Sequence, residues 1–190
     1  MDPEKHPLEA PNPPLPDRRA QVLHVGCGAP NPKKLHAVFV PDRWREVRLD
    51  IDPKVEPDVL STMVSMPDVG DASCDAIWSS HNVEHLHDHE VPTAFAEFVR
   101  VLKPTGFALI TCPNIRAVAQ LVADGRLEEP MYEAPSGVVT ALDMLYGFRH
   151  SIARGNLFMC HNTGFDADRA GRLLLNAGFD QVRVTKGTSY

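Results

Sequence analysis

Two short segments contain residues whose types and spacing suit the binding of a nucleoside. Residues 22–25 are mostly apolar and lead directly into Gly26-Cys27-Gly28, which is typical of a buried strand whose backbone bends sharply beside a ligand. About twenty residues later, residues 46–50 predict a second strand that ends in the carboxylate of Asp50. Glycines leave room for a ligand, and a carboxylate at a strand tip accepts hydrogen bonds from ribose hydroxyls. Together the two segments predict a nucleoside pocket.

Four of the nine histidines fall within residues 81–89, where imidazole suits both metal binding and proton transfer. His81, Glu84 and His85 match H-x-x-E-H, a pattern in which two histidines on one helical face bind zinc and the glutamate is a base. That pattern needs a long helix, whereas this segment directly follows an apolar strand. We therefore predict no metal ligand, and a zinc-dependent hydrolase using these three residues is kept as an alternative.

Length and composition are those of an ordinary soluble domain. The 190 residues suit one domain, and hydrophobic and charged residues make up 43% and 23% of the chain. A net charge of −6 argues against a nonspecific nucleic-acid surface, and no apolar run is long enough to span a membrane. The N-terminus has no apolar leader and the four cysteines form no C-x-x-C pair, so we expect a cytoplasmic protein with free thiols.

Apolar patterns also predict the elements that position these residues. The predicted strands are residues 22–25, 46–50, 75–80, 107–111 and 181–185. The predicted helices are residues 91–102, 115–124, 140–146 and 166–178, with at most a short helix at 33–38. Residues 126–137 read as a loop, and residues 148–163 are irregular. Strands that alternate with helices imply a parallel sheet with crossover helices.

Six sequence elements follow one another in a recognisable order. They are Gly26-Cys27-Gly28, Asp50, Cys74–Ile77, Glu84–Leu86, Arg100–Pro104 and Ala177–Phe179. Together they resemble the class I S-adenosylmethionine-dependent methyltransferases, in particular the type 11 methyltransferase domains. This resemblance covers about residues 22–184 and implies an α/β, Rossmann-like fold, a mostly parallel sheet with helices on both faces. Few residues follow Thr185, so the last, antiparallel strand of that fold is missing, cut off or supplied by a partner.

The resemblance also implies a role for each matching residue, with S-adenosylmethionine as the cofactor. The glycine turn would let the backbone approach the methionine end, a strand-tip acid would bind the ribose, and other residues would border the adenine and the sulfonium. The implied cofactor-binding residues are Gly26, Cys27, Gly28, Asp50, Met63, Ser79 and Ser80. Asp52 is the rival acid for the ribose.

Methyl transfer needs a nucleophile held in line with the methyl group and, for some acceptors, a base that removes a proton. We predict His81, beside the cofactor, and His161 as the catalytic residues. In this family, insertions such as residues 126–164 often cover the acceptor. The aromatic and polar residues that could line such a lid are Tyr132, Tyr146, Phe148, Phe158, Met159 and Arg149.

The predicted organisation is a tail followed by one domain. Residues 1–20 form a proline-rich tail, with six of the 17 prolines, and residues 21–190 form the methyltransferase domain with a lid-like insertion at about 126–164. We expect a small-molecule acceptor, no nucleic-acid partner and, as one assembly, a homodimer. The alternative is a noncatalytic module of the same fold. It is favoured by His24, which stands where the family often has an acid, and by the lack of a third glycine.

Overall fold

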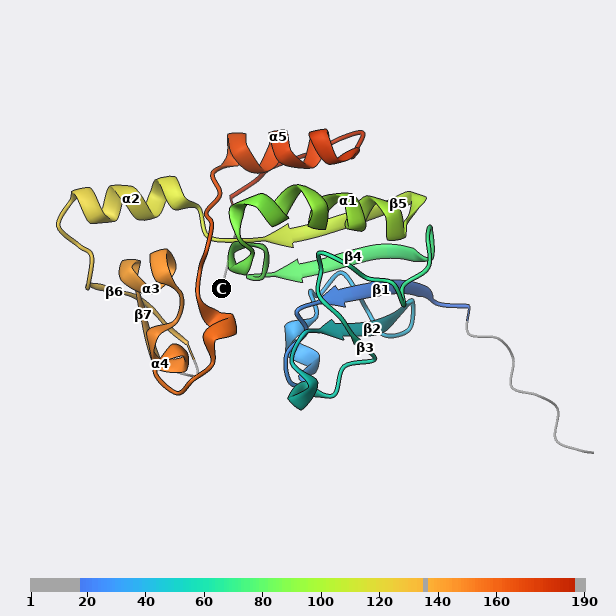
Figure 1. Cartoon of the computed structure of the whole chain (residues 1–190), viewed down its shortest axis with the longest axis horizontal. Helices are drawn as coiled ribbons and strands as arrows, with labels where there is room; N and C mark the ends of the chain where they lie inside the picture. The colour runs from blue at the N-terminus through green and yellow to red at the C-terminus, as the bar shows by residue number, and fades with distance from the viewer. Residues whose placement is uncertain (1–17, 135–136, 187–190) are drawn as a thin grey trace, which may run out of the picture.

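The computed structural model describes residues 18–134 and 137–186, so most of the predicted proline-rich tail lies outside the described residues. Its main feature is a five-stranded, fully parallel sheet with strand order β3-β2-β1-β4-β5 (Figure 1). The strands are β1 (Ala20–Val25), β2 (Trp44–Asp50), β3 (Val59–Leu60), β4 (Cys74–Ser80) and β5 (Leu102–Thr111). This confirms the Rossmann-like α/β fold and the four predicted strands within it.

The central position of β1 brings three strand ends to one edge of the sheet. β1 pairs with β2 on one side and with β4 on the other, so that Val25 lies opposite both Leu49 and Ser79. The strands are apolar on both faces, as expected for a parallel sheet covered on both sides. The glycine turn after β1, Asp50 at the end of β2 and Ser80 at the end of β4 therefore meet at the same edge.

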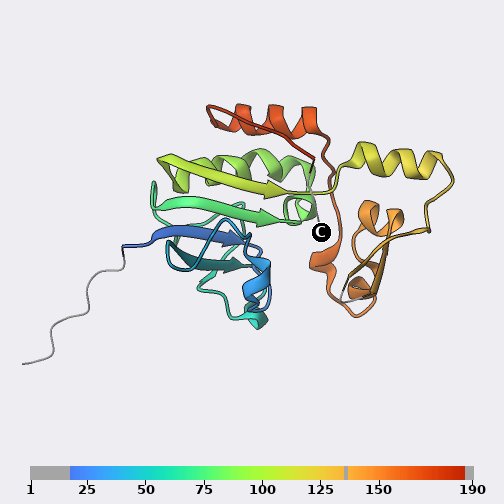
Figure 2. The ribbon, with the colours of Figure 1, turned by 180° about the vertical axis from the view of Figure 1, so that it is seen from behind.

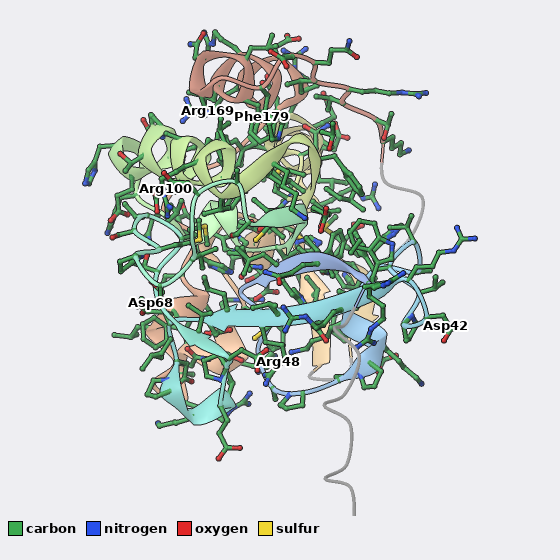
Figure 3. All side chains as sticks on the ribbon, turned by 90° about the vertical axis from the view of Figure 1, so that its right-hand side faces the viewer. Asp42, Arg48, Asp68, Arg100, Arg169 and Phe179 are labelled. Atoms are coloured by element: carbon green, nitrogen blue, oxygen red, sulfur yellow. The ribbon has the colours of Figure 1, made fainter. Side chains whose placement is uncertain are left out.

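Two helices cover one face of the sheet. α1 (Val91–Val101) buries Phe95 and Phe98 against this face, and α5 (Ala167–Ala177) packs partly buried beside it. Burial of one such aromatic side chain contributes about 1.5–3 kcal/mol. Figure 3, seen from the side, shows Arg169 and Phe179 in the helical layer and Arg48 close to the strands.

The second face is covered mainly by an irregular segment between β1 and β2. Phe39 is buried there with Trp78 and against the rings of Trp44 and Phe107. The helix allowed at residues 33–38 is only the short 3₁₀ helix η1 (Pro32–Lys34), which Asn31 caps.

A smaller unit follows the sheet and lies beyond the carboxyl ends of its strands (Figure 2). It consists of α2 (Ile115–Ala123), β6 (Pro130–Ala134), β7 (Gly137–Thr140), α3 (Ala141–Tyr146), α4 (Arg149–Ile152) and η5 (Leu157–Met159). The loop predicted at residues 126–137 is wrong, because β6 forms an antiparallel hairpin with β7. The hairpin packs on a separate apolar cluster that includes Val118, Val139 and Met144.

The strand predicted at residues 181–185 is also wrong, since residues 181–186 form no strand. Its alternating pattern buries too little apolar surface, and Val184 is 48% exposed. Within the described residues, β5 is the edge of the main sheet. No helix of the described residues is long and apolar enough to cross a membrane.

Candidate active site

The turn after β1 has the backbone geometry that its glycines predict. Gly26 and Gly28 have φ angles of 64° and 59°, in the left-handed region that side chains disfavour. The backbone amides of Gly26 and Cys27 both donate to the carbonyl of Leu49, at 2.8 and 3.2 Å. The turn is therefore tied to the end of β2.

Asp50 holds the same turn from the tip of β2. Its Oδ2 accepts from the Gly28 amide at 2.8 Å, and its Oδ1 accepts from the Asp52 amide at 2.9 Å. Each carboxylate oxygen keeps capacity for a further donor. Asp52 instead caps the 3₁₀ helix η2 (Pro53–Val55) through the amide of Lys54. Of the two rival acids, Asp50 is the one fixed beside the glycine turn.

Asn82 occupies the space in front of Gly26. A Cβ on Gly26 would lie 1.9 Å from Asn82 Oδ1, so the missing side chain leaves room for this amide. Asn82 Nδ2 donates to the carbonyls of Val25 and Ser80, at 3.0 and 2.9 Å. Two carbonyls that converge on one nitrogen, next to a strand-tip carboxylate, fit the amino group and ribose of a nucleoside-bearing amino acid such as S-adenosylmethionine, provided that Asn82 turns aside.

The other predicted cofactor residues differ in how accessible they are. Ser79 is fully buried, and its hydroxyl has no hydrogen-bond partner among the described residues. Ser80 is partly exposed and accepts from the Thr111 hydroxyl at 3.0 Å. Burial raises the pKa of the Cys27 thiol, which lies 4.0 Å from Asp50 Oδ2. Met63 follows β3 and packs, partly buried, against the main core.

His24 points away from this turn, to the second face of the sheet. Its Nδ1 lies 2.6 Å from Glu46 Oε1, and its ring lies 6.5 Å from that of Trp78. Burial lowers the pKa of His24, although the Glu46 carboxylate opposes this effect. In the sequence, His24 stands out only as a histidine where the family often has an acid. Its pairing with Glu46 becomes apparent only when β1 and β2 are aligned.

His81 begins the turn after β4. It adopts a left-handed φ of 53°, and its amide donates to the Thr111 carbonyl at 2.9 Å. Its Nδ1 lies 3.3 Å from Oε1 of Glu84, which is in the 3₁₀ helix η3 (Val83–His85). The H-x-x-E-H residues therefore lie on a tight turn and not on the long helix that the zinc hydrolase pattern requires, so that alternative is not supported.

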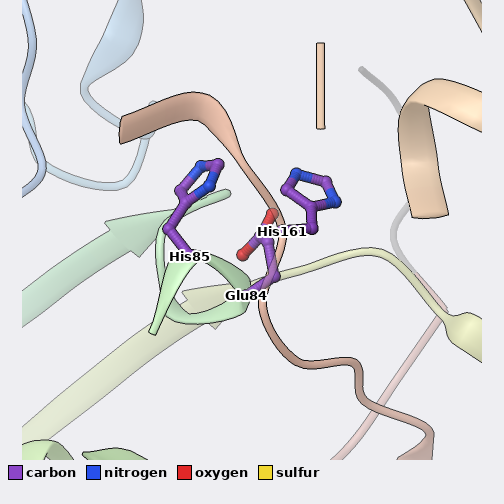
Figure 4. Close-up of side chains that lie close together, drawn as sticks. All are labelled: Glu84, His85 and His161. Atoms are coloured by element: carbon purple, nitrogen blue, oxygen red, sulfur yellow. The ribbon is translucent and has the colours of Figure 1, made fainter. Parts of the chain in front are cut away.

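His161 approaches the same turn from a distant part of the sequence. The rings of His85 and His161 lie 4.9 Å apart, with Glu84 between them in the view of Figure 4. His161 Nδ1 lies 2.8 Å from the Met144 carbonyl, which indicates an N–H at Nδ1 and a lone pair at Nε2. Burial lowers the pKa of His161, which favours the neutral ring.

Backbone contacts join the two histidine-bearing segments. The amides of Asn162 and Thr163 both donate to the Glu84 carbonyl, at 2.9 and 3.2 Å. The Asn162 side chain donates to the carbonyl of His85 at 2.8 Å, and the His161 amide donates to Tyr146. These contacts fix His161 against η3, across a separation of more than seventy residues in the sequence.

A cavity of about 220 Å³ opens beside these side chains, between η3 and the smaller unit. The lining includes polar residues from both sides and an apolar wall from the hairpin, α3 and η5. The lining residues are His81, Glu84, His85, Tyr132, Ala134, Val139, Asp143, Met144, Phe148, Met159 and His161. Of the residues predicted to line a lid, Tyr132, Phe148 and Met159 line this cavity. Tyr146 and Phe158 do not line it, and they are 64% and 54% exposed.

Glu84 belongs to this site, although it is not among the catalytic or cofactor-binding residues predicted from the sequence. Its side chain is almost fully buried, and neither carboxylate oxygen makes a hydrogen bond with a described residue. Burial and the nearby Glu84 carboxylate raise the pKa of the Cys112 thiol to about 12. The signal in the sequence was the H-x-x-E-H pattern, in which Glu84 stands beside His85 and three residues after His81.

Asp143 anchors the wall of the cavity, and replacing it with alanine is expected to destabilise the smaller unit. Its carboxylate accepts from the Thr140 amide and hydroxyl, at 2.9 and 2.7 Å, and from Arg149 Nε at 2.9 Å. Loss of this helix cap and its hydrogen bonds should cost about 1–3 kcal/mol. Chemical denaturation of wild type and Asp143→Ala measures the change in the free energy of unfolding.

The control is Arg126→Ala, which removes an exposed pair with Glu129 and should leave the free energy of unfolding almost unchanged. Burial alone would raise the pKa of Asp143, but the hydrogen bonds from Arg149 and Thr140 outweigh it and lower the pKa. The stabilisation by Asp143 is therefore present above the ordinary carboxyl pKa of about 4 and is lost as the pH falls through the lower, folded-state value. Equal stability of Asp143→Ala and wild type at neutral pH would contradict this role.

Comparisons with known proteins agree with this geometry. Residues 23–110 match the family model described as a methyltransferase domain. The chain is similar to a SAM-dependent methyltransferase from Methanosarcina mazei, with a TM-score of 0.57, 16% identity, and coverage of 90% of this chain and 85% of that chain. A SAM-dependent methyltransferase from Archaeoglobus fulgidus gives a TM-score of 0.55 and 14% identity, covering 91% and 73% of the two chains.

A third similar structure is 1,6-didemethyltoxoflavin-N1-methyltransferase from Burkholderia thailandensis, with bound 1,6-didemethyltoxoflavin and S-adenosylhomocysteine. Its TM-score is 0.53 at 16% identity, with coverage of 87% of this chain and 63% of that chain. The chain therefore spans less than two thirds of that enzyme. At these identities the similarities show the fold, and no curated protein matches the sequence.

Proposed function

We propose that this chain, whose residues 23–110 match a methyltransferase domain, is an S-adenosylmethionine-dependent methyltransferase whose acceptor is a small molecule bound beside His81 and His161. The observation that supports this proposal is the cavity of about 220 Å³ at the carboxyl edge of the sheet. That volume lies below the usual range of about 300–1,000 Å³ for drug-sized ligands. A compact acceptor suits such a cavity better than a macromolecular one.

We propose that the edge of the sheet holds the cofactor. Asp50 would accept from the ribose hydroxyls with the capacity that its two backbone contacts leave. The carbonyls of Val25 and Ser80 would take the amino group once the Asn82 amide turns aside, and Gly26 would let the ligand approach. Ser79 and Ser80 would border the methyl-bearing end, and Met63 the adenine. S-adenosylmethionine, when bound, supplies a methyl group activated by the adjacent positive sulfur.

We propose that His81 and His161 prepare the acceptor. Both line the cavity, and His161 carries its lone pair on Nε2 because its Nδ1 is held by the Met144 carbonyl. A nitrogen of this kind can accept a proton from a hydroxyl or an acidic carbon. The apolar wall of Tyr132, Phe148 and Met159 would exclude water from the acceptor.

The match of residues 23–110 to a methyltransferase domain favours an enzyme over a noncatalytic module of the same fold. A homodimer and a cytoplasmic location stay predictions, and the absence of a nucleic-acid partner rests on the net charge of −6. Small-molecule and macromolecular acceptors can be told apart by comparing turnover of small hydroxylated, amine and acidic-carbon compounds with turnover of protein and RNA substrates.

The test of this function is release of S-adenosylhomocysteine on mixing the full chain with S-adenosylmethionine and each acceptor class. We expect turnover with a small acceptor, reduced about 10²–10⁴-fold in His81→Asn if this residue is the base. Asparagine tolerates the left-handed backbone at position 81, so the variant should fold. Turnover only with protein or RNA would contradict the proposed acceptor class, and unchanged turnover in His81→Asn would remove His81 from catalysis.

A further inference from the structure

We propose that Glu84, His85 and His161 form a binding site for a divalent transition-metal ion in the wall of the cavity. One ligand atom from each of these residues lies within 4.8 Å of the other two (Figure 4). Bonds of about 2.0–2.2 Å at tetrahedral angles place ligand atoms about 3.3–3.6 Å apart, so the three side chains must move closer together to complete the site. This proposal replaces the prediction from sequence that the chain has no metal ligand.

The Glu84 carboxylate is the first argument for a cation. Its side chain is 1% exposed, and both oxygens lack a hydrogen bond to any described residue. A buried carboxylate without partners is unfavourable unless a proton or a cation neutralises it. His81 Nδ1, at 3.3 Å from Oε1, is close enough for an ion pair but does not have hydrogen-bond geometry. A metal ion between Glu84 and the two imidazoles would satisfy both oxygens.

The orientation of the two imidazole rings is the second argument. His85 Nδ1 lies 2.9 Å from the carbonyl of Cys160, and His161 Nδ1 lies 2.8 Å from that of Met144. Histidines that bind metals usually donate their other N–H to a carbonyl or carboxylate, which fixes the ring and directs the remaining lone pair at the ion. The His161 ring is held in this way by the backbone, and the Nδ1 contact of His85 is of the same kind.

The second nitrogen of His85 provides the competing explanation. Nε2 lies 3.1 Å from the carbonyl of His81, so a positively charged ring could donate to two carbonyls and neutralise Glu84 without any metal. A neutral ring has a single N–H and can donate to only one of these two carbonyls, so its other nitrogen carries a lone pair that an ion could bind after a small rotation of the ring. The two explanations differ in whether Glu84 is needed for metal binding, which an experiment can measure.

The donor set indicates the kind of ion. Two imidazoles and one carboxylate suit Zn²⁺, Fe²⁺, Co²⁺ or Mn²⁺ more than the oxygen-preferring Mg²⁺ and Ca²⁺. Three protein ligands leave coordination positions for another molecule, and Glu84, His85 and His161 all line the cavity. On the proposed function, those positions would bind an oxygen of the acceptor and lower the pKa of its hydroxyl. Because Nε2 of His161 would then be bound to the ion, His81 would be the residue that accepts the proton in the metal-bound protein. The metal site itself does not depend on that function.

Titration of the chelator-treated, full-length chain with Co²⁺ tests the site, because the visible absorption of this ion reports its ligands. We expect about one equivalent to bind, Zn²⁺ to displace it, and Glu84→Gln to weaken binding at least about 100-fold. The matched control is the double variant His87→Ala/His89→Ala, which removes an exposed, stacked histidine pair with rings 5.9 Å apart. That variant should bind Co²⁺ with unchanged affinity.

Three outcomes would overturn the metal site. They are no Co²⁺ binding by the folded wild type, unchanged affinity in Glu84→Gln, and loss of binding in the His87/His89 variant, which would assign the ion to the surface pair. If Glu84→Gln fails to fold, as judged by thermal unfolding, His161→Ala is measured in its place with the same expected loss. S-adenosylhomocysteine binding is measured on the same samples, since its persistence without metal binding would refute the metal site alone.

Discussion

Asp50→Ala is expected to weaken binding of S-adenosylhomocysteine by about 1–3 kcal/mol, or roughly 5- to 150-fold. The carboxylate has two tasks in this account. It would accept from the ribose, and it already holds the glycine turn through the Gly28 amide at 2.8 Å. Removing the carboxylate leaves both the Gly28 amide and the ribose hydroxyls of the ligand without an acceptor. Fluorescence or calorimetric titration of both proteins measures the difference.

Two further variants separate these tasks. Asp50→Asn keeps one acceptor for the Gly28 amide but removes the charge, so its loss of affinity should be smaller than that of Asp50→Ala. Asp52→Ala removes only the cap of η2, where the carboxylate accepts from Lys54, and should leave affinity within about threefold of wild type. A large loss in Asp52→Ala with none in Asp50→Ala would reverse the assignment of the ribose acid.

Gly147→Ala is expected to destabilise the smaller unit by about 2–5 kcal/mol. Gly147 has a φ of 95° and a ψ of 165°, a conformation that is almost restricted to glycine. A Cβ at this position would also lie 1.8 Å from the carbonyl oxygen of Met159. Because the clash is with backbone, the segment that carries His161 would have to move away from η3. Hydrogen exchange of residues 157–163, together with thermal unfolding, measures the effect.

Gly155→Ala is the matched control for this substitution. Gly155 lies in the same unit and has a φ of 90°, but a Cβ there would meet no atom within 4 Å. It should therefore cost only the backbone strain, about 1–2 kcal/mol. Equal destabilisation by the two substitutions would show that the contact between Gly147 and Met159 does not hold this segment in place.

The parts of the fold that the sequence predicted are those determined by local pattern. The apolar run before Gly26 and the charge of Asp50 at a strand end identify β1 and β2, because a parallel strand is buried on both faces. Capping residues also predicted where three helices begin. Asn114, Thr140 and Asp166 each accept a hydrogen bond from a backbone amide in the first turn of α2, α3 and α5.

The errors arise where long-range contacts decide the structure. Residues 130–134 form a strand only because residues 137–140 pair with them over Val118 and Met144. Residues 181–185 have the alternating pattern of a strand, but they pair with no strand of the described residues, although β5 is paired on one side only. Pairing partners of this kind are not visible in a local pattern.

The sequence predicted only part of the candidate site, because the rest depends on long-range contacts. Its cofactor edge follows from strand order, so Gly26, Asp50 and Ser80 could be expected to meet. His161 reaches η3 only through the backbone contacts of Asn162 and Thr163 with Glu84, which no spacing in the sequence reveals. The burial of the Glu84 carboxylate, and its lack of a hydrogen bond to any described residue, become apparent only in the folded structure.

The most direct test of the central claim is equilibrium dialysis of labelled S-adenosylhomocysteine against the folded, full-length chain. The account predicts saturable binding of about one ligand per chain, with a dissociation constant in the micromolar range that rises in Asp50→Ala. The absence of saturable binding at millimolar ligand, in protein shown to be folded, would contradict the assignment of the glycine turn and Asp50 to the cofactor.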